Sequence, residues 1–359
     1  MLSPGGGVTR TLCKGEAMLP TQRPLELAEL EHLLDGVGTP VATRMLSGGT
    51  FSAVQAVDLA DGRTVVAKTS VPVGALEDGR TPLLTYEHDM LRSEHDTLRL
   101  VESMSGVPAP RVLAADFTRE HFNVDAIVMT MIEGTPWDTV IETMSAEANE
   151  HAAHQVGGIL ASMKAATAPR FGYPANDFAL GGETWPEFFV KLMETVVADA
   201  EQWGVDIEAS RVMEAVLQGV DALEEVTAPV LLHNDLWHGN VLLDPATGHV
   251  HGVVDFERSL FGDPLWDFVG AESMQTGPTT PALLAGFEAA GGTLPRGPEA
   301  GTPTGFTQSA DVRTTLYRLW TLSVQFIEIV PRGFHGEWVT GHRDKILRLR
   351  AALLERAGV

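Results

Sequence analysis

Apolar residues recur along the first third of the chain at two different periods. Leucines at helical spacing in PLELAELEHLLDG predict a short amphipathic helix over residues 24–36. Three runs of strand-like alternation follow, at residues 41–46, 51–59 and 64–71. The second and third runs are separated by Asp61-Gly62, a pair typical of a tight hairpin turn. The pattern therefore predicts a meander of antiparallel strands.

The period changes again beyond the third run. Residues 86–104 show the 3.6-residue spacing of a helix, and two further strand-like runs cover residues 111–117 and 125–132. The breakers Glu133-Gly134-Thr135-Pro136 then interrupt the pattern. We interpret residues 133–136 as a hinge between two lobes.

The remainder of the chain is mostly helical in pattern. Helices are predicted at residues 145–168, 185–204, 208–226, 311–330 and 338–357, with a shorter one at PALLAGFEAA inside the Gly- and Pro-rich segment 276–310. This order predicts an α+β protein. Its expected parts are a disordered tail (1–22), an N-terminal lobe (23–132), the hinge (133–136) and a C-terminal lobe (137–359).

Length and composition favour a soluble protein. The 359 residues are enough for two lobes, and the single cysteine, Cys13, excludes an intrachain disulfide. The N-terminal sequence lacks the apolar core of a secretory signal, and no stretch is long enough to cross a membrane. We expect a cytoplasmic protein with no membrane partner.

The charge is strongly acidic, with 25 Lys and Arg against 48 Asp and Glu and a formal net charge of −23. Such a field repels nucleic acid and attracts cations, so we expect no nucleic-acid partner. A cationic small molecule would suit it, although an acidic surface also serves solubility alone. The pattern does not fix an oligomeric state.

The most informative segment is HNDLWHGN, residues 233–240, followed fifteen residues later by Asp255. Two short strand-like runs, 240–243 and 251–254, flank a turn and would bring Asn240 and Asp255 together as a hairpin. Kinases need a carboxylate that accepts a hydroxyl proton, and an amide and a second carboxylate that hold Mg²⁺ on a nucleotide. Asp235, Asn240 and Asp255 fit these three roles in order. The segment therefore predicts an ATP- and Mg²⁺-dependent kinase of small molecules.

Plainer interpretations of this segment compete with the catalytic one. A single aspartate in a loop is most often a cap or turn former. His233 and His238 could be taken for a zinc pair, but their spacing of five differs from the four of a helical zinc motif. His233 follows two leucines, which favours a buried orienting group. The agreement of several parts in one string favours the catalytic loop.

Lys68, in VVAKTS, is the candidate that would reach the nucleotide phosphates from a strand. Glu94 on the predicted helix is its expected ion-pair partner, with Glu87 and Glu102 as alternatives. A lysine that extends to water is the competing interpretation.

A phosphate-covering loop would have to lie just upstream of Lys68, in LSGGTFS. Gly48 and Gly49 would let backbone amides approach phosphate oxygens, and the hydroxyl of Thr50 or Ser52 could add a hydrogen bond. A Gly-Gly pair between strands is more often a simple turn. No Walker sequence is present, which argues against a P-loop kinase.

Taken in order, Lys68, Glu94, HNDLWHGNVLLD and VVDFERSLFGDPLWDF resemble the aminoglycoside phosphotransferase family. The resemblance covers residues 40–350 and implies a bilobal protein-kinase-like fold: an N-terminal antiparallel sheet with one helix and a mostly helical C-terminal lobe. It implies Asp235 as the catalytic base and Asn240 and Asp255 as Mg²⁺ ligands.

The resemblance also implies the residues that support these groups. His233 and Asp267 would hold the catalytic loop, and the backbone of a hinge near Met129 to Gly134, which includes Met131 and Glu133, would hold the adenine of ATP. One departure is Asn234, which stands where the family usually has glycine. Eukaryotic protein kinases are disfavoured because no H-R-D, D-F-G or A-P-E string occurs.

The acceptor is the least determined part. An aminoglycoside or related antibiotic is the first expectation; the alternatives are a nucleoside antibiotic, choline, homoserine or an amino sugar, and a pseudoenzyme that only binds nucleotide. HNDLW is also reminiscent of choline and fructosamine kinases. Acidic residues that could meet ammonium groups, each more often a surface charge or cap, are Glu257, Asp263, Glu272 and Glu328.

Overall fold

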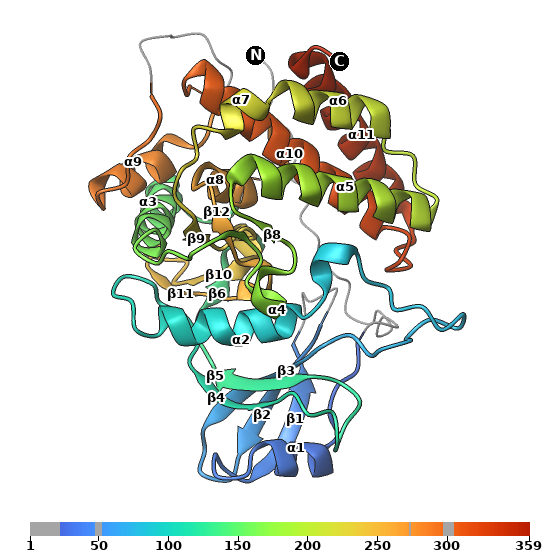
Figure 1. Cartoon of the computed structure of the whole chain (residues 1–359). Helices are drawn as coiled ribbons and strands as arrows, with labels where there is room; N and C mark the ends of the chain where they lie inside the picture. The colour runs from blue at the N-terminus through green and yellow to red at the C-terminus, as the bar shows by residue number, and fades with distance from the viewer. Residues whose placement is uncertain (1–21, 47–51, 273, 297–304) are drawn as a thin grey trace.

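The computed structural model describes residues 22–46, 52–272, 274–296 and 305–359. An N-terminal lobe built on a five-stranded sheet lies below a larger lobe built mainly of helices (Figure 1). The α+β class expected from the sequence is confirmed. Most of the tail predicted to be disordered lies outside the described residues.

The N-terminal sheet is antiparallel throughout, in the order β1-β2-β3-β5-β4. Its strands are β1 (Pro40–Met45), β2 (Ala53–Leu59), β3 (Thr64–Thr69), β4 (Val112–Asp116) and β5 (Ala126–Thr130). One face, with Val65 and Val128, packs in a core with helix α1 (Leu27–Leu33). Val66 joins the core shared with the rest of the molecule. Because side chains alternate along a strand, Lys68 lies on the same face as Val66, away from α1.

Helix α2 (Met90–Val101) lies between the sheet and the C-terminal lobe (Figure 1). The sequence predicted one helix over residues 86–104, which is wrong at its beginning. Asp89 adopts a left-handed conformation with φ +59°, and a separate 3-10 turn, Thr85–Glu87, precedes it. Within α2, Glu94 is buried.

Two small sheets lie in the C-terminal lobe. The first has the order β11-β10-β6 and consists of β6 (Thr135–Pro136), β10 (Val241–Leu243) and β11 (Val250–Val253). The second has the order β8-β7-β12-β9 and consists of β7 (Phe171–Gly172), β8 (Gly181–Gly182), β9 (Val230–Leu232) and β12 (Leu260–Gly262). The hinge proposed from the sequence contributes β6, so it pairs directly with the predicted hairpin. Most of these strands have two or three residues, too few for a period to reveal them.

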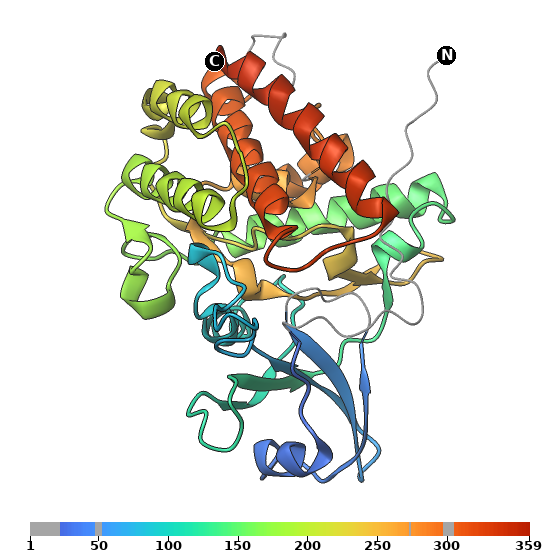
Figure 2. The same ribbon diagram turned by 90° about the vertical axis from the view of Figure 1, so that its right-hand side faces the viewer.

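The helices of this lobe cover both small sheets (Figure 1). They are α3 (Ala146–Met163), α4 (Ala175–Phe178), α5 (Trp185–Trp203), α6 (Ala209–Gln218), α7 (Val220–Leu223), α8 (Leu265–Ala271), α9 (Pro281–Ala289), α10 (Gln308–Glu328) and α11 (Glu337–Ala357). The long helices α10 and α11 pack side by side near the C-terminus (Figure 2). Gly219 divides the helix predicted over residues 208–226 into α6 and α7, and α8 was not predicted.

An aromatic cluster forms the centre of this lobe. The rings of Trp266 and Tyr317 stack at 4.9 Å, and the edges of Trp185 and Trp320 pack against Trp266. The Tyr317 hydroxyl donates to the buried carboxylate of Asp263 at 2.7 Å and accepts from Trp185 Nε1 at 2.8 Å. These tryptophans are core residues, and each is at most 2% exposed.

Helices α3 and α9 make a close backbone contact through glycine. A Cβ atom added at Gly157 would lie 2.1 Å from the carbonyl oxygen of Leu283 and 2.7 Å from the amide nitrogen of Phe287. A Cβ atom at Gly286 would lie 1.8 Å from the carbonyl oxygen of His154. The two helices therefore approach more closely than any side chain would permit.

We predict that Gly157→Ala lowers the free energy of unfolding by about 2–3 kcal/mol, because the backbone of α9 must move away. Gly158→Ala is the matched control, since its nearest neighbour would be 3.9 Å away. That change should be neutral or stabilise the protein by up to ~1 kcal/mol through helix propensity. Urea unfolding curves of both variants measure this, and equal midpoints would contradict the contact.

Candidate active site

The ammonium group of Lys68 joins the two lobes. β3 directs it away from α1, and its Nζ lies 2.7 Å from Glu94 on α2. It also lies 2.6 Å from Asp255 and 2.8 Å from Glu257, both in the segment after β11. Lys68 is only 4% exposed, so the interpretation as a lysine extending to water is wrong. The ion pair expected between Lys68 and Glu94 is present.

The other two glutamates considered as partners of Lys68 are engaged elsewhere. Glu87 pairs with Arg332 in the C-terminal lobe. Glu102 pairs with Arg111 at the outer end of α2, at 3.0 Å. Of the three candidates, position 94 alone lies on the part of α2 that reaches Lys68.

Three carboxylates around one lysine leave a surplus of negative charge. Burial raises the pKa of Glu94 to about 7, although the neighbouring Lys68 opposes that shift. Burial would also lower the pKa of Lys68, but the charges of Asp255, Glu257 and Glu94 outweigh it and raise the pKa. Lys68 therefore stays charged, and the cluster has room for a further positive charge.

Glu257 is the member of the cluster that the sequence did not reveal as a partner of Lys68. Besides Lys68, it accepts a hydrogen bond from the Ser52 hydroxyl at 3.2 Å, across the two lobes. Its position two residues after Asp255 was the available signal. Asp255 immediately precedes a 3-10 turn (Phe256–Arg258) and Glu257 lies within it, so both carboxylates can reach the same ammonium group.

The predicted catalytic loop, residues 233–240, is held in place through its backbone amides. The Asp267 carboxylate of α8 accepts from the amide of Asn234 at 2.7 Å and from the amide of His233 at 3.3 Å. The His233 ring is fully buried and lies 3.1 Å from the carbonyl oxygen of Val254. Burial lowers the pKa of His233 to about 4, so the ring is neutral and donates to that carbonyl. These contacts join the loop to the segment that carries Asp255.

Asn234 has a conformation that accounts for its departure from the usual glycine. Its φ is +61°, in the left-handed region that glycine favours. Asparagine is among the few other residues that adopt this region readily. The backbone path that the loop needs is therefore retained at this position.

The predicted hairpin brings Asn240 and Asp255 to one end. β10 and β11 pair Val241 with Val253, and the amide of Val254 donates to the Asn240 carbonyl at 3.0 Å. The Asn240 side chain donates to the carbonyl oxygen of Asp235 at 2.8 Å. This leaves its amide oxygen as the free acceptor on the same side chain.

Asp235 keeps an accessible carboxylate, with 29% of its side chain exposed. Burial of the surrounding site raises its pKa to about 7, and Arg258 opposes the shift. The Nε atom of Arg258 lies 3.8 Å from Asp235 Oδ2, and its guanidinium also pairs with Glu328 at 2.9 Å. A carboxylate with a pKa near neutrality can both accept and release a proton.

The partners of Arg258 form a chain of contacts that reaches the N-terminal end of α2. Glu328 on α10 lies 3.2 Å from the Tyr86 hydroxyl and 3.5 Å from Arg332. Arg332 also pairs with Glu87, in the 3-10 turn that precedes α2. A second buried charge network thus joins the two lobes, apart from Lys68.

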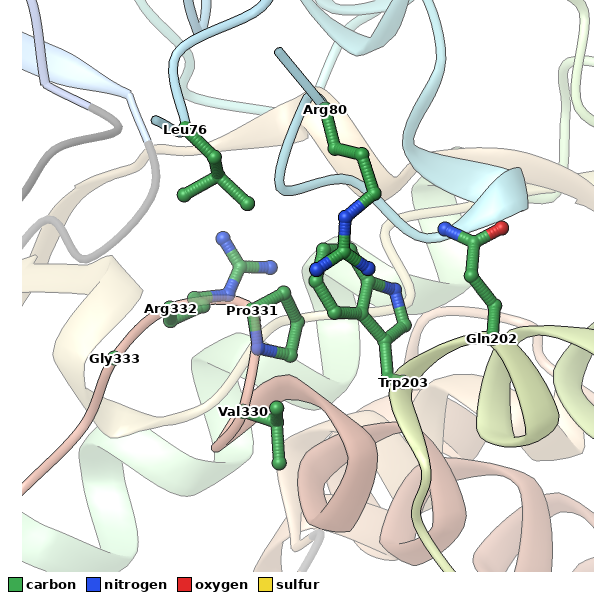
Figure 3. Close-up of a pocket in the computed structure, with 8 residues that line it drawn as sticks. All are labelled: Leu76, Arg80, Gln202, Trp203, Val330, Pro331, Arg332 and Gly333. Carbon is green, nitrogen blue, oxygen red and sulfur yellow. The ribbon is translucent and has the colours of Figure 1, made fainter. Parts of the chain in front are cut away.

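Arg332 also forms one wall of a cavity of about 290 Å³ between the segment that precedes α2 and the end of α10 (Figure 3). Arg80 extends over the ring of Trp203 on its other side, at 4.3 Å (Figure 3). The described lining residues include none of the Lys68 cluster.

The remaining predicted site residues lie in the glycine loop and the hinge. Gly48, Gly49 and Thr50 lie outside the described residues. Ser52 is buried and bonded to Glu257. In the hinge, the Met131 side chain is exposed, and the Glu133 carbonyl lies 3.0 Å from His251 Nδ1. The nucleotide-binding role of both hinge residues stays a prediction.

The acidic residues considered for ammonium groups of an acceptor all have internal partners. They are Glu257 with Lys68, Asp263 with Arg313, Glu328 with Arg258, and Glu272 with Thr280. Glu257, Asp263 and Glu328 therefore compensate basic side chains of the protein, whereas Glu272 uses only one of its two oxygens.

The donor set near Lys68 fits a divalent cation. Carboxylate oxygens of Glu94, Asp255 and Glu257 lie within 4.8 Å of one another. Together with the free amide oxygen of Asn240, they are the hard ligands that Mg²⁺ prefers. The surplus negative charge of the cluster also favours a cation.

Residues 43–303 match the phosphotransferase enzyme family (APH), and the chain belongs to that family. It is also 33% identical over 135 residues to a probable ketoamine kinase of Enterococcus faecium. That alignment covers 31% of this chain and 48% of the relative, so it spans about half the length of the relative.

Solved structures share the fold. The complex of a thermostable aminoglycoside phosphotransferase APH(4)-Ia variant with AMP-PNP and hygromycin B has a TM-score of 0.60 at 17% identity, over 92% of this chain and 98% of the other. The streptomycin and ATP complex of APH(2″)-IIa has a TM-score of 0.56 at 16% identity, over 92% and 99%. The predicted family resemblance and the bilobal protein-kinase-like fold are confirmed.

We predict an asymmetry between the partners in the Lys68 cluster. Lys68→Met leaves the buried carboxylates of Glu94 and Glu257 and the half-buried one of Asp255 without a counter-charge, and should lower the free energy of unfolding by about 3–5 kcal/mol. Glu257→Gln removes one surplus charge and keeps an acceptor for Ser52, so it should cost less than ~1 kcal/mol. Urea unfolding at pH 7.5 without nucleotide compares them. Equal losses of unfolding free energy in the two variants would contradict a surplus of negative charge in the cluster.

Proposed function

We propose that the protein transfers the γ-phosphate of ATP to a hydroxyl group of a small molecule. The observation that carries the proposal is the buried Lys68, shared by Glu94 and Asp255, next to a loop that presents the accessible carboxylate of Asp235. A lysine and glutamate pair, a metal-binding aspartate and a base in this arrangement are the parts of a kinase site. Membership of the phosphotransferase family supports it.

Each residue has a role that its position permits. Lys68, aligned by Glu94, would contact the α- and β-phosphates. Asp235 would accept the proton of the attacking hydroxyl and orient its oxygen toward the γ-phosphorus, while Arg258 holds the carboxylate. Asn240 and Asp255 would hold Mg²⁺, which when bound neutralises charge on the phosphates. His233 and Asp267 would act by positioning the loop.

For the acceptor, we propose a cationic antibiotic of the aminoglycoside type, phosphorylated in the cytoplasm. The net charge of −23 supports a cationic molecule. Similar structures have hygromycin B or streptomycin bound beside AMP-PNP or ATP. The action would be that of a resistance enzyme.

A second candidate is a kinase of sugar-derived ketoamines. The match to a probable ketoamine kinase, 33% identical over 135 residues, favours it. The same residues would carry the chemistry, because both acceptors present a hydroxyl. A pseudoenzyme is disfavoured, since a protein that only binds nucleotide has no need of Asp235.

The test is transfer of the γ-phosphate from Mg-ATP to a panel of aminoglycosides, ketoamines and other alcohols. Asp235→Asn should bind ATP normally but lower kcat by roughly 10² to 10⁴, the contribution of a positioned base. Asp244→Asn, in the turn of the same hairpin, should keep wild-type turnover. Unreduced turnover in Asp235→Asn would refute the base, and tight ATP binding without any transfer by the wild type would favour a pseudoenzyme.

Asp255→Asn should weaken nucleotide binding only when Mg²⁺ is present. The amide keeps the shape of the side chain but loses the anionic oxygen that a hard cation prefers, so the Mg²⁺ concentration for half-maximal ATP binding should rise about tenfold or more. Titration of Mg²⁺ at fixed ATP measures it, with ATP in EDTA as the control. An unchanged titration would remove Asp255 from the metal site.

A further inference from the structure

A cavity of about 200 Å³ lies beside the catalytic loop, between the segment after the hinge, α3, α8 and α9. Its walls are largely carbon, from Trp137, Ile141, Ala153, Val156, Leu236 and Leu283. Two catalytic-loop residues line it, Leu236 and His238, but Asp235 and the described members of the Lys68 cluster do not. It is therefore a different site from the one to which phosphotransfer is assigned.

Glu272, at the end of α8, is the polar group of this cavity that is only half satisfied. Its residue exposure is 8%, and one oxygen, Oε1, accepts from the Thr280 amide at 3.0 Å and the Thr280 hydroxyl at 2.5 Å. The other oxygen, Oε2, is buried and has no well-aligned hydrogen bond among the described residues, and the Thr279 side chain contributes only weakly to lowering the pKa of this carboxyl. A buried carboxylate oxygen without a donor is costly, and such atoms in native proteins usually have a ligand or ion.

The nearest basic side chain does not supply that donor. Arg318 on α10 favours the charged form of Glu272, but its guanidinium donates to the carbonyls of Thr276 and Gly277, at 3.3 and 3.1 Å. Burial accordingly raises the pKa of Glu272. A ligand that brings its own positive charge would satisfy the carboxylate.

Asn149 and His238, two other polar side chains of the wall, make contacts within the protein. The Asn149 oxygen accepts from Trp137 Nε1 at 2.7 Å, and its amide group donates to the Ile141 carbonyl at 3.0 Å. The His238 ring packs on Trp137 at 4.1 Å, and burial lowers its pKa to about 4, so it is neutral. The wall is thus largely apolar and carries two carboxylates, those of Glu272 and Glu150.

We propose that this cavity binds a small organic ammonium ion, with the cationic group on Glu272 and a compact hydrocarbon body against Leu236, Leu283 and Trp137. The volume is below the 300–1,000 Å³ typical of drug-sized sites, which limits the body to about one ring. Anions are excluded by the two carboxylates. The site requires neither nucleotide nor phosphotransfer, so it stands independently of the proposed function.

The test uses two amine and alcohol pairs of equal shape: benzylamine with benzyl alcohol, and cyclohexylamine with cyclohexanol. Both amines are charged at pH 7.5. Ligand-observed NMR titrations without nucleotide give the dissociation constants. Each amine should bind the wild type at least tenfold more tightly than its alcohol.

Variants separate the charge from the cavity. Glu272→Gln keeps an acceptor for Thr280 and should abolish the preference for the amine, while changing the affinity for the alcohol by less than about twofold. Glu147→Gln removes the same charge from an exposed position on α3 and should retain the preference. Ala153→Leu fills the cavity and should weaken both members of each pair.

Thermal melting of each variant verifies that it is folded. The proposal is overturned if neither amine binds the wild type, or if amine and alcohol bind equally. A preference that persists in Glu272→Gln would also overturn it. The amine and alcohol comparison on the wild type needs no variant, so a misfolded variant does not remove the test.

Discussion

The attraction between the Lys68 ammonium group and three carboxylates is the interaction on which the rest of the site depends. It connects β3, α2 and the segment after β11, three elements that are far apart in the sequence. Holding a buried ammonium group beside three carboxylates, two of them buried, is favourable only while the charges compensate one another, so the relative position of the lobes and the ionisation of the cluster are linked. Glu257 adds the Ser52 hydrogen bond to the same junction.

Backbone conformation, rather than side-chain packing, orients the rest of the site. Asp267 fixes two successive amides of the catalytic loop, and Asn234 and Asp255 both adopt positive φ. Left-handed residues change the chain direction sharply, so the loops that follow β9 and β11, strands of two different sheets, can present Asp235 and Asp255 at one site. The His233 ring, neutral and fully buried, joins the two loops.

Much of the fold could be predicted because the sequence patterns are long. Helices of about twenty residues such as α5, α10 and α11, and the strands of the N-terminal sheet, have enough repeats for the period to be clear. The ion pair of Lys68 with Glu94 followed from the order of motifs. The break at Asp89, the strands of two or three residues and the partners of Glu257 did not, because they depend on tertiary contacts that no local pattern contains. The network from Arg258 to Glu87 escaped prediction for the same reason.

The glycine contact between α3 and α9 affects how the protein can be redesigned. Gly157 and Gly286 are closed to every larger residue, so the main chain of α9 lies at a fixed distance from α3, and the buried side chains of Leu283, Leu284 and Phe287 add to this packing. Libraries that aim at new ligand selectivity can therefore randomise exposed positions of α9, such as Ala285 and Glu288, while the scaffold keeps its geometry. In natural variation, the same arrangement would let the exposed face of α9 diverge while its position on α3 stays constant.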